Sequence, residues 1–164
     1  MTNPFFLNII GANDNHRRFI TAMKFISNSI EDTQKFAGGF AKKMKPGAVL
    51  ALYGSLGAGK TAFIQGLAKG LGFRGKVFSP TFIFVRPYRI GDRKSKIDTF
   101  YHIDLYRLEE TTDLKSIGIS EFLAEANAVS AIEWPEKIEK LLPKNATKIK
   151  IEVLGENKRK ITWP

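Results

Sequence analysis

Eight consecutive residues have the types and spacing of a phosphate-binding loop. Residues 54–61 read Gly-Ser-Leu-Gly-Ala-Gly-Lys-Thr and match the pattern G-x-x-x-x-G-K-[ST]. The glycines let the backbone curl so that successive N–H groups face one anion at the positive end of the following helix. Lys60 is then expected to reach the β- and γ-phosphates, and the Thr61 hydroxyl to ligate Mg²⁺. The octet predicts a nucleotide-binding protein, and a Gly-rich turn with a solvated lysine is a poor rival explanation.

A P-loop enzyme also needs an acidic residue at the end of a buried strand, to hold the metal's water shell or to orient the attacking water. Asp104 and Glu133 qualify, because each ends an apolar run in which a carboxylate is costly unless it meets a cation. The alternative for each is an acid that caps a turn or pairs with Arg107. The only Asn-Lys pair is followed by Arg159 and so lacks the guanine-reading Asp, which favours ATP.

Apolar periodicity predicts the elements that position these residues. A strand is expected at residues 48–53 before the loop, and a helix at residues 61–71 after it. The later expectations are an antiparallel hairpin of residues 81–88 and 97–104, one or two short helices within residues 113–126, a buried strand at 129–133, and a terminal hairpin of residues 148–153 and 160–163 turning at 155–158.

Residues 19–44 are expected to be mostly helical. Apolar positions from Phe19 to Met44 recur at mostly helical intervals, with a break near Asn28. Residues 29–32, Ser-Ile-Glu-Asp, resemble a capping box, so a helix should start there and end before Pro46. Residues 1–22 are predicted to be an N-terminal extension, and residues 23–164 a single P-loop domain.

Composition limits the class of protein. The chain has 164 residues, of which 43% are hydrophobic and 26% charged, as in a single globular domain. It contains no cysteine, which excludes disulfides and thiolate metal sites and agrees with a reducing compartment. No signal peptide or membrane-spanning run is indicated, so we expect a cytoplasmic protein without a membrane partner. The net charge of +10 favours polyanionic partners or only solubility, and no RRM-type octamer decides between them.

Five motifs in order resemble the TsaE (YjeE) family, the P-loop ATPases of bacterial tRNA threonylcarbamoyladenosine biosynthesis. They are Thr33 in the first helix, the loop 54–61, Ser79-Pro-Thr-Phe82, His102-Ile-Asp-Leu-Tyr-Arg107 and Glu133-Trp-Pro135, which together cover about residues 24–163. The resemblance implies an α/β fold with a mixed parallel and antiparallel sheet flanked by helices. It also implies ATP and Mg²⁺ as cofactors, a TsaB–TsaD complex as partner, and tRNA reached indirectly through that complex.

The resemblance assigns roles to particular residues of these motifs. Lys60, Asp104 and Glu133 are expected to be catalytic, and Thr61 and Glu133 to ligate Mg²⁺. The expected nucleotide-binding residues are Leu56, Gly57, Ala58, Gly59, Lys60, Thr61, Ala62, Thr33, Trp134 and Arg159. The expected switch residues are Ser79, Pro80 and Thr81. For Thr33, Arg159 and Trp134 the alternatives stay open: a helix-surface hydroxyl, a solvated turn cation and simple packing.

The function implied is an ATP-hydrolysing subunit that supports turnover of the TsaB–TsaD complex in tRNA N6-threonylcarbamoyladenosine synthesis. Its Mg²⁺-dependent hydrolysis of ATP is expected to be weak without its partners. Two alternatives remain: a small-molecule kinase, for which the chain leaves little room for a lid, and a basic RNA-binding module with regulatory ATP. Ser55 and Ala62 depart from the family pattern, where an acidic and a second hydroxyl residue are common, so the tuning of hydrolysis stays open. His102 is expected to be a satisfied core histidine.

Overall fold

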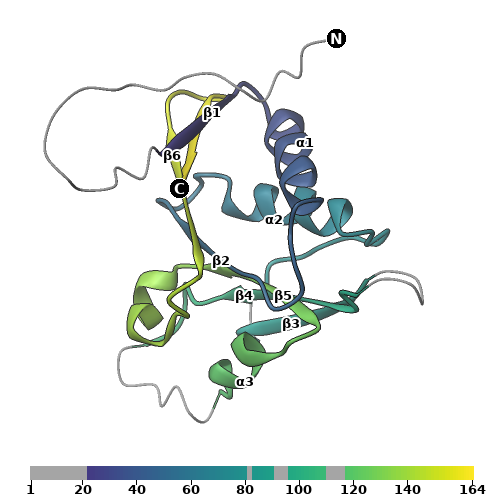
Figure 1. Cartoon of the computed structure of the whole chain (residues 1–164). Coiled ribbons are helices and arrows are strands. Elements are labelled where there is room, and N and C mark those ends of the chain that lie inside the picture. Colours follow the sequence, from purple (N-terminus) through teal and green to yellow (C-terminus); the bar gives the residue numbers. More distant parts are fainter. Residues whose placement is uncertain (1–21, 81–82, 91–95, 110–116) are drawn as a thin grey trace, which may run out of the picture.

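The computed structural model describes residues 22–80, 83–90, 96–109 and 117–164. These residues form a seven-stranded sheet flanked by helices, with the strand order β1-β7-β6-β2-β5-β4-β3 (Figure 1). The elements in chain order are β1 Met23–Ser27, α1 Ile30–Ala41, β2 Val49–Tyr53, α2 Lys60–Gly70, β3 Val85–Arg89, β4 Thr99–Asp104, α3 Ile119–Ala124, β5 Ala128–Glu133, the 3₁₀ helix η1 Pro135–Leu141, β6 Thr147–Val153 and β7 Arg159–Trp163.

The sheet has a parallel centre and antiparallel edges. Strand β2 pairs in parallel with β5 and β6, and β4 pairs in parallel with β5. At the edges, β3 is antiparallel to β4, and β7 is antiparallel to both β6 and β1. The central strands β2 and β5 are almost continuously apolar because helices or loops cover both of their faces. The predicted α/β fold with a mixed sheet is confirmed.

Helices α1 and α2 lie against one face of the sheet and pack closely on each other. Ser29 caps α1, because its hydroxyl accepts a hydrogen bond from the Asp32 N–H at 3.1 Å. Glycines make the helix contact possible: a Cβ on Gly66 would lie 2.2 Å from the carbonyl oxygen of Gln34. A second apolar cluster, which includes Val49, Tyr101, Ile119 and Ile138, fills the opposite face.

The helical interpretation of the segment before Asn28 is wrong, because Met23–Ser27 is the edge strand β1. It pairs with β7, with Phe25 opposite Ile161, and the Phe25 ring stacks on Phe36 with centroids 4.4 Å apart. A five-residue segment is too short for periodicity to distinguish strand from helix, so pairing with a distant strand decides its structure. Phe19 lies outside the described residues.

The other differences concern boundaries. The first strand of the predicted hairpin begins at Val85, residues 83–84 form a bend, and residues 81–82 lie outside the description. The short helix η1, with Pro135 at its start, has no counterpart among the predicted elements. The extension 1–22 falls almost wholly outside the described residues, so that domain boundary stays a prediction.

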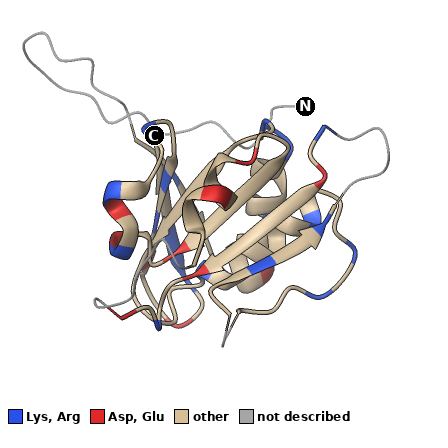
Figure 2. Ribbon diagram, turned by 90° about the horizontal axis from the view of Figure 1, so that it is seen from below, with Lys and Arg blue, Asp and Glu red and all other residues tan. Residues whose placement is uncertain are grey.

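In the part of the chain that is described, no helix is long and apolar enough to span a bilayer. Figure 2 shows basic residues on helices, strands and loops on several sides of the domain.

Candidate functional site

The phosphate-binding loop joins the carboxyl end of β2 to the first turn of α2. Gly54 is required because a Cβ there would lie 2.5 Å from the carbonyl oxygen of Ile151 on β6. Gly59 has a φ of 99°, in the left-handed region, and directly precedes α2. The N–H groups in the first turn of a helix have no acceptor within the helix, and they lie at its positive end. The local fold therefore presents an anion-binding helix terminus.

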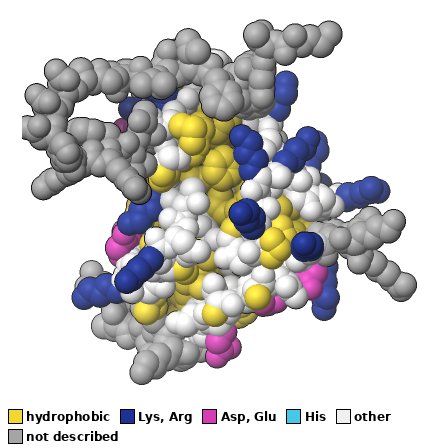
Figure 3. Space-filling view, in the orientation of Figure 1, with side chains coloured by type: hydrophobic (Ala, Val, Ile, Leu, Met, Phe, Trp, Pro, Cys, Tyr) yellow, Lys and Arg dark blue, Asp and Glu magenta, His cyan; other side chains and the backbone are white. Residues whose placement is uncertain are grey.

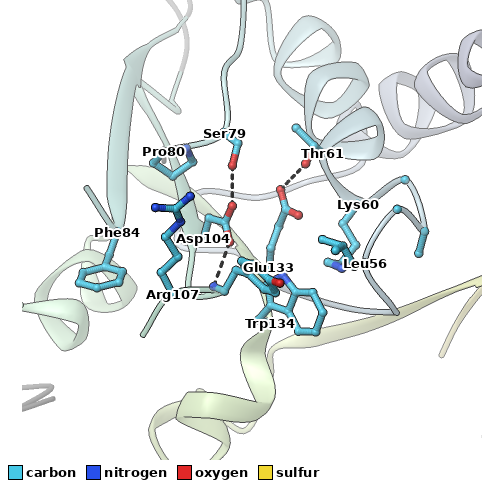
Figure 4. Close-up of a pocket in the computed structure, with 14 residues that line it drawn as sticks. Leu56, Lys60, Thr61, Ser79, Pro80, Phe84, Asp104, Arg107, Glu133 and Trp134 are labelled. Atoms are coloured by element: carbon cyan, nitrogen blue, oxygen red, sulfur yellow. Dashed lines mark hydrogen bonds between the residues drawn. The ribbon is translucent and has the colours of Figure 1, made fainter. Parts of the chain in front are cut away.

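A cavity of about 540 Å³ opens beside this loop (Figure 4). It is lined by Leu56, Gly57, Ala58, Gly59, Lys60, Thr61, Ser79, Pro80, Phe84, Asp104, Tyr106, Arg107, Glu133 and Trp134. The loop supplies one wall, and the ends of β4 and β5 supply the other. The structure thus brings together most of the residues that the sequence predicted for the site.

Glu133 lies at the centre of a buried hydrogen-bond network. Its Oε1 accepts a hydrogen bond from the Thr61 hydroxyl at 2.9 Å, and Nε2 of His102 lies 2.9 Å from the same oxygen. Glu133 is 4% exposed and His102 is fully buried. We infer from this contact that Nε2 carries the proton, because a carboxylate can only accept. Nδ1 of His102 has no partner, so the histidine is only half satisfied, contrary to expectation.

Asp104 lies on the strand next to Glu133, and the two residues are direct partners in the parallel pair β4–β5. Its Oδ2 accepts a hydrogen bond from the Ser79 hydroxyl at 2.5 Å, and its Oδ1 accepts one from the Tyr106 N–H at 3.1 Å. Asp104 therefore caps the turn that follows β4 and also faces the cavity. Its bond to Ser79 links it to the segment predicted to act as a switch.

Lys60 is folded back onto its own loop. Its Nζ donates to the carbonyl oxygens of Gly54 and Ser55 at 2.7 and 2.9 Å, and it lies 4.0 Å from the centroid of the Trp134 ring. Burial lowers the pKa of Lys60 from its ordinary value of 10.5, and the nearby carboxylates, Glu133 first, oppose that shift. Trp134 has a φ of 61°, an unusual value for a bulky side chain that often marks a functional position.

Arg159 and Thr33 lie at different distances from the cavity. Arg159, at the start of β7, donates from Nε to the carbonyl oxygen of Ala58 at 3.0 Å and from Nη2 to that of Gly57 at 3.4 Å. It therefore holds the backbone of the loop without lining the cavity. The buried hydroxyl of Thr33 lies 2.7 Å from that of Ser27 and does not line the cavity. Ser27 is in turn the partner of Arg159 in the β1–β7 pair, so Thr33 is connected to the loop only indirectly by this route.

Two other predicted residues are not in the cavity lining. Ala62 belongs to α2 but does not line the cavity, and Thr81 lies outside the described residues. Three lining residues, Phe84, Tyr106 and Arg107, carried no predicted role in the site. Arg107 could have been found, because a cation three residues after a strand-end acid must lie near the end of that strand.

The chemistry of the donors fits a hard divalent cation. Thr61 offers a hydroxyl, and Glu133 and Asp104 offer carboxylates, and such oxygen donors suit Mg²⁺. Within the described ranges, no three His, Cys, Asp or Glu side chains gather into a metal cluster. A site with so few protein ligands suits Mg²⁺, which usually keeps several waters and takes further ligands from substrate phosphates.

Comparison with known proteins identifies the family. The sequence model described as "Threonylcarbamoyl adenosine biosynthesis protein TsaE" matches residues 27–161. The chain belongs to the TsaE family. That match contains the loop 54–61, both strand-end acids and Arg159.

Individual TsaE proteins are similar over most of their length. The chain is 37% identical over 141 residues to the tRNA threonylcarbamoyladenosine biosynthesis protein TsaE of Bacillus subtilis, covering 86% of this chain and 84% of that protein. It is 36% identical over 140 residues to the protein of the same name from Treponema pallidum, covering 85% and 98%. The crystal structure of Bacillus subtilis YdiB superposes with a TM-score of 0.71 at 33% identity, covering 90% of this chain and 87% of that one.

Proposed function

We propose that this TsaE-family protein is an ATP-hydrolysing subunit of the machinery that makes threonylcarbamoyladenosine in tRNA. The observation that carries the proposal is the contact between Thr61 of the phosphate loop and Glu133 at the end of β5. It joins a phosphate-binding loop to a buried carboxylate inside one cavity, as hydrolysis of a nucleotide requires. The names of the relatives support the pathway.

Phosphate binding falls to the loop and to Lys60. The N–H groups at the start of α2 would donate hydrogen bonds to the phosphate oxygens. Lys60 would exchange its contacts with two carbonyl oxygens for contacts with the β- and γ-phosphates. Trp134 would remain beside the ammonium group, and Arg159 would keep the loop in its bound shape. Arg107, which lines the same cavity, would supply a second positive group against phosphate charge.

Two carboxylates divide the remaining work. Thr61 and Glu133 would hold Mg²⁺, which when bound neutralises charge on the phosphate oxygens. Asp104 would orient the attacking water, because it faces the cavity and is fixed on one side by the Tyr106 N–H. Ser79 would report the state of the γ-phosphate, since any movement of its segment changes its hydrogen bond to Asp104.

The proposal places the protein in the cytoplasm with a TsaB–TsaD complex as its partner. The protein would not modify the base itself, and its ATP cycle would let the complex turn over repeatedly. It would meet tRNA mainly as part of that assembly. The pathway name of its relatives motivates this arrangement.

The test separates binding from turnover. ATP binding by calorimetry and hydrolysis with and without TsaB–TsaD are measured for wild type, Lys60→Ala and Asp104→Ala. Lys60→Ala should abolish productive binding, whereas Asp104→Ala should spare binding and lose turnover by about 10²-fold or more, the usual scale for a positioned acid or base. Equal loss of binding in both variants would contradict the role of Asp104. Wild type that neither hydrolyses ATP nor binds the complex would refute the proposal, and phosphorylation of a metabolite would favour a kinase.

A further inference from the structure

A second, larger hollow of about 1640 Å³ lies between β1, α1 and the segment that leads into β2. Its floor includes the partly buried rings of Phe25, Phe40 and Trp163, which pack against the main core. Its rim carries six exposed lysines, namely Lys24, Lys35, Lys42, Lys43, Lys45 and Lys69. We call this surface the lysine groove. Figure 3 shows hydrophobic side chains gathered in the region that β1 and α1 occupy in Figure 1, with basic side chains beside them.

The charge of the groove is concentrated and unpaired. Six lysines against the single acid Glu31 give a local charge of +5, half of the +10 carried by the whole chain. Among the described residues, the ion pairs of lysine involve only Lys148, Lys150 and Lys160, none of which lines the groove. The C-terminal dipoles of α1 and α2 favour cations at the ends of these helices, which accounts for Lys42, Lys43 and Lys69 but not for Lys24 on β1 or Lys35 within α1. The groove therefore suits a polyanionic partner.

The combination of aromatic floor and lysine rim favours RNA over an acidic protein. Unpaired bases stack on aromatic side chains while basic side chains follow the phosphates. Protein–protein interfaces, by contrast, are depleted in lysine relative to the rest of the surface. The sequence has no contiguous RNA-binding signature, because β1, α1, α2 and β7 each contribute part of the surface. We propose that the lysine groove binds RNA directly, and that tRNA is its ligand.

The groove and the nucleotide cavity lie at opposite ends of the central strands. Ala48, Val49 and Thr147, at the amino ends of β2 and β6, line the groove, whereas the phosphate loop follows the carboxyl end of β2. Helix α2 spans both, because Lys60 at its start faces the nucleotide cavity and Lys69 near its end lines the groove. RNA and ATP can therefore bind together. The inference does not depend on ATP hydrolysis.

The test uses the full-length protein, an unmodified tRNA transcript, and a titration of salt. The variant Lys42→Gln/Lys43→Gln removes two charges from the groove. The matched control Lys140→Gln/Lys158→Gln removes two exposed charges outside it. About 0.7 counterions are released per phosphate contact, so losing two lysine contacts should reduce the steepness of log K for tRNA binding against log salt by about 1.4. At 0.1 M salt this corresponds to about 25-fold weaker binding by the groove variant. The control should retain the wild-type slope.

Several outcomes would overturn the inference. These are wild type that does not bind the tRNA, equal losses in both double variants, or a polyglutamate competitor as effective as a single-stranded oligonucleotide at equal charge. A groove variant that loses TsaB–TsaD binding but keeps tRNA binding would also overturn it and identify a protein interface. ATP hydrolysis by the groove variant should equal that of wild type, so failure here and failure of the proposed function are distinguishable.

Discussion

Replacing His102 tests whether Glu133 must be held in place before the metal binds. Oε1 of Glu133 accepts hydrogen bonds from Thr61 and His102, and Thr61 must leave if its hydroxyl turns to Mg²⁺. His102 then remains as the fixed partner of a carboxylate that is 4% exposed. His102→Leu removes the donor and fills its buried place with an apolar side chain. His102→Gln returns an amide donor at the position of Nε2.

The magnitude follows from the freedom that Glu133 regains. Fixing a glutamate side chain costs about 1.5–2 kcal/mol in conformational entropy. In metal-free His102→Leu, Thr61 still restrains Glu133 in part, so about 1–2 kcal/mol of this cost would fall on metal binding. At 1.4 kcal/mol per factor of ten, the Mg²⁺ concentration for half-saturation should rise about 5- to 30-fold in His102→Leu. Loss of a hydrogen bond to a charged group should also lower the free energy of unfolding by about 1.5–3 kcal/mol.

The assay is calorimetric binding of a non-hydrolysable ATP analogue as free Mg²⁺ is varied, with a parallel titration in EDTA. Binding without metal should change little, and His102→Gln should recover most of the wild-type Mg²⁺ requirement. Ser130→Ala is the control, because Ser130 lies on β5 with Glu133 and the change removes its partly buried hydrogen bond to the carbonyl oxygen of Phe122 without removing a partner of Glu133. If this control shifts the Mg²⁺ requirement as much as His102→Leu, or if Leu and Gln behave alike, the positioning argument is refuted.

Three further predictions concern other parts of the fold. Gly66→Ala should lower the free energy of unfolding by about 1–3 kcal/mol in urea denaturation, because its Cβ would meet Gln34, whereas Gly155→Ala in the open β6–β7 turn should be nearly neutral. Arg159→Ala should weaken ATP binding about tenfold in calorimetry through loss of the brace on the loop, and unchanged affinity would contradict that role. Burial, followed by the bond to Glu125, raises the pKa of Tyr101 to about 12 from 10.0. The unfolded chain loses this proton at a lower pH than the folded protein, so the free energy of unfolding should fall as the pH rises from 10 to 12. When denaturation is compared at pH 8 and pH 11, the free energy of unfolding of Tyr101→Phe should fall less than that of wild type.

Local features of the site were predictable from the sequence, and long-range contacts were not. The order of strand, Gly-rich loop and helix around Lys60 is local, so apolar patterning and one motif were enough to predict it. Asp104 and Glu133 were recognisable as acids at strand ends. Their side-by-side position depends on the register of β4 and β5, which patterning does not encode.

The strand β1 and the contacts between side chains of the site depend on distant partners, which apolar patterning does not encode. β1 is a strand because β7, at the other end of the chain, pairs with it. The His102–Glu133 contact needs two strands in register. Arg159, which the family resemblance named as a nucleotide-binding residue, reaches the loop because the terminal hairpin folds back beside it. The lysine groove is likewise assembled from separate elements, each of which is unremarkable alone.

The strand order also has a consequence for how the protein is made. β7 lies between β1 and β6, so the first strand of the domain has no partner until residues 159–163 are available. On the ribosome, β1 and the loop at residues 54–61 would wait until residues 159–163 have left the exit tunnel. Arg159 then arrives with β7, so closing the sheet edge and bracing the phosphate loop occur in the same late step. A chain that ends before Arg159 should therefore lack both the β1–β7 pair and the contacts of Arg159 with the phosphate loop, which should weaken its binding of ATP.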